Sequence, residues 1–111
     1  MADRAVILAR ASSDKQVIEG DTLDDQVLQC SKFIDKNGWE LYKVFPLVES
    51  GRKGEREYFQ EVLQFCEEPK NAIRYVVFIN ISRFTRQGEG KYFHFKERLE
   101  KSGVQIRDTV S

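Results

Sequence analysis

The run Ala5-Val-Ile-Leu-Ala9 lies close to the N-terminus and contains no polar residue. A short, unbroken apolar run of this kind is typical of a β-strand that is covered on both faces, as in parallel sheets. Tyr75-Val-Val-Phe-Ile79 is a second run of the same type. Because such strands need helices on either side of the sheet, the two runs favour an α/β fold.

Three segments between and after these runs have apolar residues spaced three or four positions apart, which indicates amphipathic helices. Their stripes are Leu23, Val27, Cys30 and Ile34, then Phe59, Val62, Leu63 and Cys66, then Tyr92, Phe95 and Leu99. Gly38 and Gly103 follow the first and third stripes, where glycine often ends a helix. Residues 39–45 and 104–106 are the remaining strand candidates. This alternation predicts three layers, with a mainly parallel sheet of four to five strands and helices on both faces.

The composition is that of one ordinary globular domain. The chain has 111 residues, of which 41% are hydrophobic and 32% charged. No apolar run reaches the roughly 20 residues of a membrane span, and the N-terminus lacks a signal-peptide cleavage pattern, so we expect a cytoplasmic protein. The two cysteines, Cys30 and Cys66, form no paired metal motif and are expected to be reduced and buried.

Net charge restricts the function. Eighteen basic residues balance eighteen acidic ones, unlike the basic surface of a self-sufficient DNA-binding domain. If this domain acts on DNA, most of the affinity must therefore come from elsewhere.

Polar segments of similar composition follow each of the first three predicted strands. Each of these segments combines arginine with a hydroxyl side chain: Arg10 and Ser12, then Ser50 and Arg56, then Ser82, Arg83 and Arg86. In parallel sheets, ligands bind beyond the carboxyl ends of the strands. Guanidinium groups match phosphate oxygens and stabilise the charge that gathers during attack on a phosphodiester. Surface arginines paired with acidic neighbours would explain any one segment, so the prediction of a phosphate site depends on all three together.

The order and spacing of these residues resemble the N-terminal catalytic domain of serine recombinases, the resolvase/invertase family. The matching positions are Arg10, Ser12, Gln16, Leu23 and Gln26, then Ser50, Gly51 and Arg56, then Arg83 and Arg86. The resemblance covers nearly the whole chain. The long segment between Ser12 and Gln26 is more similar to large serine recombinases and transposon-type members than to small resolvases.

The resemblance implies a specific chemistry, without metal or cofactor. Ser12 would attack the scissile DNA phosphate and form a 5′-phosphoserine link, before strand exchange within a tetramer and religation. Arg10, Arg83 and Arg86 would bind and polarise the phosphate. The remaining positions would complete or support the pocket: Ser50, Arg56, Gln16 and Gln26. The implied partners are double-stranded DNA and, for the full-length protein, further copies in a homodimer and homotetramer.

The chain departs from the family pattern at two positions. Leu8 stands where a tyrosine is usual, and Ser82 stands where an aspartate usually precedes the first arginine of the Arg-x-x-Arg pair. A serine cannot supply that carboxylate, so the chemistry would be slower or another carboxylate would take the role. The family's dimerisation helix and DNA-binding region would lie beyond Ser111, so we expect residues 1–111 to be the catalytic domain of a longer protein.

Two other functions remain as alternatives. A flavodoxin-like regulatory or interaction module without catalysis would usually have an acidic cluster or a glycine-rich phosphate loop after the first strand, and neither is present. A phosphatase or nuclease that uses Ser12 would need a metal set or a general acid. His94 lacks a second metal-type residue at a suitable spacing and is expected to be a helix-surface or half-buried residue.

Overall fold

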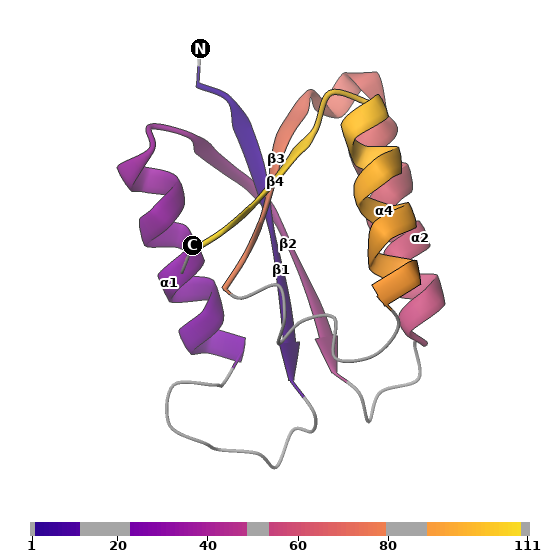
Figure 1. Cartoon of the computed structure of the whole chain (residues 1–111). Helices are drawn as coiled ribbons and strands as arrows, with labels where there is room; N and C mark the ends of the chain where they lie inside the picture. Colours follow the sequence, from indigo (N-terminus) through magenta and orange to yellow (C-terminus); the bar gives the residue numbers. More distant parts are fainter. Residues whose placement is uncertain (1, 12–22, 49–53, 80–88, 110–111) are drawn as a thin grey trace.

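Strands and helices alternate in the computed structural model, which describes residues 2–11, 23–48, 54–79 and 89–109. The elements are β1 (Arg4–Ala11), α1 (Leu23–Lys36), β2 (Glu40–Val48), α2 (Glu55–Glu67), the 3-10 turn η1 (Pro69–Asn71), β3 (Ile73–Phe78), α4 (Glu89–Lys101) and β4 (Gln105–Asp108) (Figure 1). Gly38 and Gly103 follow α1 and α4 with φ of 76° and 82°, which confirms both predicted helix ends. No helix in the described ranges is long and apolar enough to cross a membrane.

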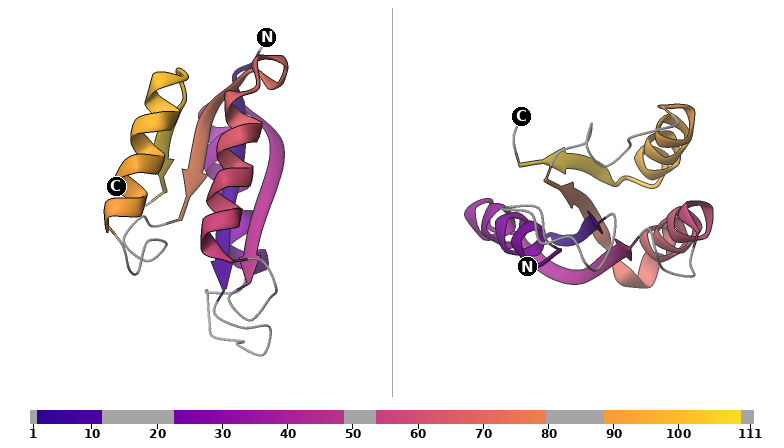
Figure 2. Two further views of the ribbon diagram at one scale, coloured as in Figure 1. Left: turned by 90° about the vertical axis from the view of Figure 1, so that its right-hand side faces the viewer. Right: turned by 90° about the horizontal axis from the view of Figure 1, so that it is seen from below.

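The four strands form one parallel sheet in the order β2-β1-β3-β4. The chain passes from β1 to β2 in one direction and from β2 through β3 to β4 in the other. Because crossovers between parallel strands are right-handed, the reversal places α1 on one face and α2 and α4 on the other (Figure 2). The predicted α/β fold, with helices on both faces of a parallel sheet, is confirmed.

Residues 5–9 of β1 are apolar without a break because helices cover both faces of this strand. Val6 and Leu8 pack into the core cluster beneath α2 and α4, whereas Ala5 and Ile7 pack into the cluster beneath α1. All four side chains are at most 1% exposed. Burying a large apolar side chain is worth about 1.5–3 kcal/mol, so both faces of this strand stabilise the fold.

Two aromatic rings stack on the α1 side of the sheet, one from β3 and one from the residue just before β2. Trp39 precedes β2 and Tyr75 belongs to β3, yet their rings stack with centroids 3.6 Å apart and planes inclined by 11°. Ala5, which is the register partner of Tyr75 in β1, lies in the same cluster and is fully buried. A methyl group at this position leaves room for two rings to cover the strand from either side.

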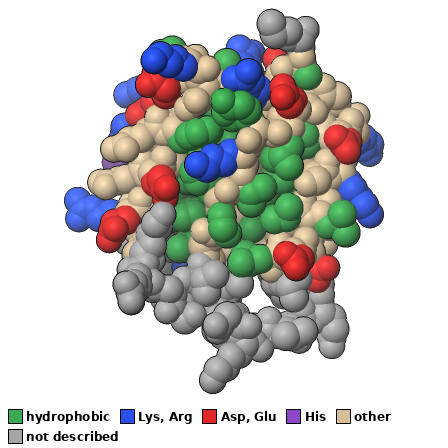
Figure 3. Space-filling view, turned by 180° about the vertical axis from the view of Figure 1, so that it is seen from behind, with side chains coloured by type: hydrophobic (Ala, Val, Ile, Leu, Met, Phe, Trp, Pro, Cys, Tyr) green, Lys and Arg blue, Asp and Glu red, His purple; other side chains and the backbone are tan. Residues whose placement is uncertain are grey.

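Strand β2 is an edge strand with apolar side chains on the surface. Leu41 and Tyr42 are exposed, and hydrophobic side chains gather on the face seen from behind, with a basic side chain among them (Figure 3). The Lys43 ammonium lies 5.1 Å and 5.0 Å from the ring centroids of Phe45 and Phe65. Lys43 and Pro46 are residue types that oppose pairing with another strand, so they protect this edge from aggregation.

Candidate active site

The sheet topology defines where a ligand would bind. The connections from β1 and β3 lead to opposite sides of the sheet, toward β2 and β4 respectively. In open parallel sheets, the crevice for ligands lies at such a switch point, beyond the carboxyl ends of the two strands. Ser12 directly follows β1, while Arg83 and Arg86 belong to the segment between β3 and α4.

Several predicted site residues lie outside the described residues: Ser12, Gln16, Ser50, Arg83 and Arg86, together with Ser82. The structure describes the other three predicted positions, Arg10, Gln26 and Arg56, and the strand ends that lead to the undescribed segments. Two of these three lie together and the third lies apart from them.

Gln26 of α1 holds the backbone of Arg10 in β1. The Arg10 N–H donates to Gln26 Oε1 at 3.0 Å, and Gln26 Nε2 donates to the Arg10 carbonyl at 2.7 Å. Among the described residues, the register between β1 and β3 runs from Arg4 to Ile7, and Arg10 lies three residues beyond it. A glutamine amide carries N–H donors beside a carbonyl acceptor, so it can bond the backbone N–H and the carbonyl of one residue at the same time. The chain is thereby fixed two residues before Ser12.

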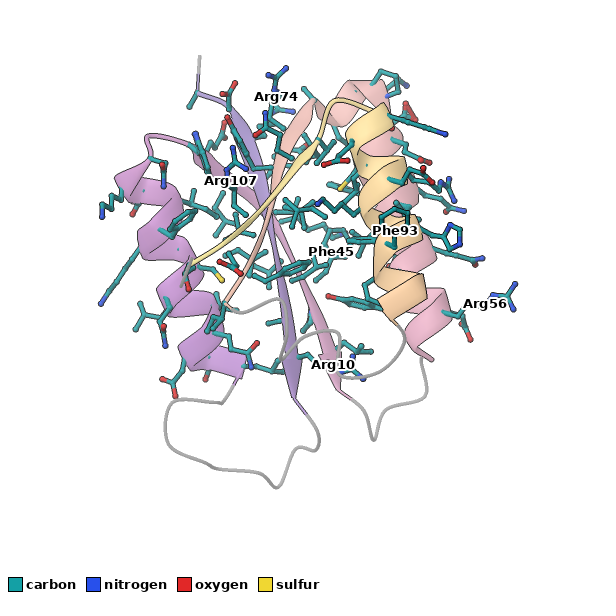
Figure 4. All side chains as sticks on the ribbon, in the orientation of Figure 1. Arg10, Phe45, Arg56, Arg74, Phe93 and Arg107 are labelled. Atoms are coloured by element: carbon teal, nitrogen blue, oxygen red, sulfur yellow. The ribbon has the colours of Figure 1, made fainter. Side chains whose placement is uncertain are left out.

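The Arg10 side chain belongs to the opposite face of the sheet from Gln26. Side chains alternate along a strand, and Leu8 packs toward α2 and α4, so Arg10 projects on that side. Its charge affects the pKa of Tyr58 in α2. Burial raises this pKa and Glu61 raises it further, whereas the positive charge of Arg10 lowers it. Arg10 lies at the lower end of β1, where the strand ends (Figure 4). Its backbone is therefore held from α1, and its side chain lies near α2.

Tyr58 was not among the predicted site residues. It is 1% exposed, and its hydroxyl donates a hydrogen bond to the carbonyl of Phe45 in β2. The spacing of four between Tyr58 and Val62 is a helical core signal, and it could have placed Tyr58 on the buried face of α2. Leu8, at the position where the family usually has tyrosine, lies in the same core cluster.

Arg56 is not close to Arg10. It lies in the first turn of α2 and is exposed, and its side chain points away from the sheet and from Arg10 (Figure 4). The helix dipole places partial positive charge at this end of α2, so it gives a cation no local stabilisation. Arg56 and Arg10 share the same end of the molecule but do not form one cluster here.

Asp108 is a carboxylate at the same edge that the sequence did not single out. It is the last residue of β4, it is half-buried, and it is the register partner of Phe78 at the end of β3. Alternation from Val104 places Asp108 on the face of the sheet that α4 covers. Thr109 extends this pairing, because its N–H donates to the Phe78 carbonyl at 3.1 Å and its hydroxyl to the Ile79 carbonyl at 3.1 Å.

The two cysteines and the histidine are not part of the candidate site at the carboxyl edge of the sheet. Cys30 and Cys66 are buried and unpaired, as predicted, and burial raises the pKa of each thiol to about 12, with Glu67 adding to the effect at Cys66. His94 is exposed on α4. Within the ranges that the structure describes, no three His, Cys, Asp or Glu residues are grouped so that they could hold a metal ion.

Comparisons with known proteins give consistent results. The family model described as the resolvase N-terminal domain matches residues 5–110. Among solved structures, the C-terminal catalytic domain of ISC1926 TnpA, an IS607-like serine recombinase, has 26% sequence identity and a TM-score of 0.74, over 95% of this chain and 69% of that one. No curated protein sequence matches the chain.

Two further solved structures are similar in fold. The N-terminal catalytic domain of TP901-1 integrase has 22% identity and a TM-score of 0.77, over 96% of this chain and 77% of that one. A resolvase family site-specific recombinase from Streptococcus pneumoniae has 19% identity and a TM-score of 0.77, over 96% of this chain and 71% of that one.

Proposed function

Because this chain belongs to the resolvase N-terminal domain family, we propose that it is the catalytic domain of a serine-type site-specific DNA recombinase. Ser12 Oγ attacks the scissile phosphorus, and a new Oγ–P bond forms as the bond from phosphorus to the DNA 3′ oxygen breaks. The serine proton leaves, and the 3′ oxygen takes up a proton to become a hydroxyl. The product is a 5′-phosphoserine link, and the reverse attack by a 3′ hydroxyl religates the strand.

The observation that carries this proposal is the anchoring of Arg10. Its backbone is fixed by the two hydrogen bonds to Gln26, at the end of the strand that leads directly into Ser12. Positioning a nucleophile and a cation on a rigid element lowers the barrier, because the reacting groups need no reorganisation. Gln26 therefore has a positioning role in the proposal, and it acts on the backbone rather than on the phosphate.

The other predicted residues complete the phosphate site. Arg83 and Arg86 follow β3, which lies next to β1 at the switch point, and they bind and polarise the phosphate oxygens. Ser50 and Gln16 contribute hydrogen bonds from the segments after β2 and β1. Arg56, whose side chain points outward in the structure, contacts the DNA backbone at the rim of the site.

Asp108 offers a carboxylate to compensate for Ser82. It lies at the carboxyl edge beside the last residue of β3, from which the segment with Arg83 and Arg86 continues. A half-buried carboxylate next to this segment can orient a guanidinium by charge-assisted hydrogen bonds. Asp108 thus takes the role that a serine at position 82 cannot perform.

Most of the affinity for DNA is assigned to a part of the protein beyond this domain. The equal numbers of basic and acidic residues support this view, because phosphate contacts by Lys and Arg dominate binding to duplex DNA. The active form is then a homotetramer on double-stranded DNA, assembled from homodimers of the full-length protein. Tight, salt-sensitive binding of duplex DNA by residues 1–111 alone would contradict this assignment.

Covalent trapping tests the proposed nucleophile. The full-length recombinase is incubated with a duplex that carries its recombination site, and the protein–DNA adduct that survives denaturation is quantified. Wild type is compared with Ser12→Ala and with the matched control Ser13→Ala. We expect the adduct in wild type and in Ser13→Ala, and none in Ser12→Ala.

Other outcomes assign a different function. An adduct that persists in Ser12→Ala would show that another side chain is the nucleophile. If no variant forms an adduct while DNA binding is intact, the domain is a catalytically inactive regulatory or interaction module with the recombinase fold.

A further inference from the structure

Tyr58 places a polar atom in the core where a phenylalanine would fill almost the same space. It is the largest fully buried side chain among the described residues, and it packs in the cluster with Leu8, Phe45 and Val62. A buried hydroxyl is costly unless it is hydrogen-bonded, and the Phe45 carbonyl accepts its proton. The hydrogen bond therefore fixes the direction in which the hydroxyl points.

The position of this hydroxyl follows from the strand register. Phe45, its acceptor, is paired with Leu8 across β1 and β2, and Leu47 is paired with Arg10 two residues further along. Leu8 and Arg10 project on the same face, the one that α2 covers. The hydroxyl therefore lies at a carbonyl of β2 that is one strand across and two residues back from Arg10, and the effect of the Arg10 charge on the pKa of Tyr58 agrees with that placement.

The geometry points to Tyr58 as a positioning residue that orients the Arg10 guanidinium toward the carboxyl edge of β1. Because the hydroxyl proton is directed at the Phe45 carbonyl, the oxygen presents its lone pairs to its other neighbours. Lone pairs attract the cationic guanidinium and limit the rotamers that the Arg10 side chain adopts. A neutral phenol does this without cancelling the charge that a DNA phosphate requires. The inference rests on the proposed role of Arg10 in phosphate binding.

Glu61 is the other charged group near this hydroxyl, because it raises the pKa of Tyr58 while Arg10 lowers it. Glu61 is exposed on α2, where water screens its charge, whereas Tyr58 is buried against the sheet. The phenol, which is buried and hydrogen-bonded to the Phe45 carbonyl, is thus the more fixed of these two groups.

The first test observes Arg10 directly, in the chain of residues 1–111 without DNA. The Nε–H resonance of Arg10 is recorded in ¹⁵N-labelled protein and assigned by its absence in Arg10→Lys. We expect Tyr58→Phe to shift this resonance and to speed its exchange with water. The matched control Tyr42→Phe makes the same chemical change at an exposed residue of β2 and should leave the resonance unchanged. An unchanged Arg10 resonance in Tyr58→Phe would overturn the inference.

The second test separates positioning from stability in the full-length recombinase. Adduct formation is measured in single turnovers at saturating DNA, well below the melting temperature of each variant. If Arg10 stabilises the transition state, Tyr58→Phe lowers the saturated rate about tenfold and leaves the DNA concentration for half-saturation unchanged. A lower melting temperature with an unchanged saturated rate would reduce Tyr58 to a structural residue. A shifted Arg10 resonance in a protein that forms no adduct would leave the positioning role intact and remove the proposed function instead.

Discussion

The side-chain amide of Gln26 makes two hydrogen bonds to the backbone of Arg10, one through its oxygen and one through its nitrogen. The two residues lie sixteen positions apart, on α1 and at the end of β1. Within the part of the chain that the structure describes, the register of β1 with β3 ends at Ile7, so this contact holds β1 beyond that register. The contact also fixes the end of β1, which the proposed nucleophile Ser12 directly follows. It therefore contributes to the stability of the fold and to the proposed catalytic site.

Removal of the Gln26 amide should destabilise the fold. Gln26→Leu leaves the Arg10 N–H and carbonyl without this partner, which should lower the free energy of unfolding by about 1–3 kcal/mol. Urea denaturation of residues 1–111 measures the change. Gln29→Leu, an exposed position on the same helix, is the matched control and should change stability by less than about 0.5 kcal/mol. Equal effects of the two substitutions would show that the contact is unimportant.

Asp108 should matter for catalysis more than for stability. If its carboxylate orients an arginine of the segment after β3, Asp108→Asn should slow adduct formation by the full-length protein about tenfold, which corresponds to ~1.4 kcal/mol in the activation barrier. DNA affinity, measured by fluorescence anisotropy, should stay the same. Asp35→Asn, on the exposed surface of α1, provides the control. A normal rate in Asp108→Asn would mean that the protein works without this carboxylate.

Ala5 should tolerate no larger side chain. The rings of Trp39 and Tyr75 stack at the face of β1 where Ala5 is buried, so Ala5→Leu would force them apart. Overpacking of this kind costs about 1–3 kcal/mol. The chain has one tryptophan, so its fluorescence reports the loss of the stack directly. Ala2→Leu, at an exposed position before β1, should leave both the spectrum and the stability unchanged.

Stability should fall at alkaline pH because of the buried thiols. Burial raises the pKa of Cys30 and of Cys66 from 9.0 to about 12. In the unfolded chain both thiols ionise above pH 9, while in the folded protein they stay protonated, so the stabilising effect is complete below pH 9 and is lost as pH rises toward 12. Urea denaturation at pH 7.5, 9.5 and 10.5 measures this decline.

The double variant Cys30→Ala/Cys66→Ala is the control for the thiol effect. Its stability is lower throughout, but it should depend less on pH above 9. A pH dependence identical to that of wild type would assign the decline to other groups, with Tyr58 the first candidate, because burial also raises the pKa of its hydroxyl.

The elements were predictable because their signals are local. Apolar runs, helical spacing and two glycines identified β1, β3 and the helices α1, α2 and α4. The strand ends were less well predicted. Strand β2 continues through Pro46 to Val48, beyond the predicted end at Phe45, because an edge strand has one free side and tolerates proline there.

The sequence by itself determined the α/β class, the segments with arginine and serine, and the family resemblance, because each of these is a pattern of neighbouring residues. Only the tertiary structure decided which side chains meet. The contact of Gln26 with Arg10, the contact of Tyr58 with Phe45, and the pairing of Asp108 with Phe78 all depend on strand order, register and the face that each helix covers. The physical reason is that these contacts join residues distant in the chain, and packing of the whole core, rather than local propensity, sets their geometry.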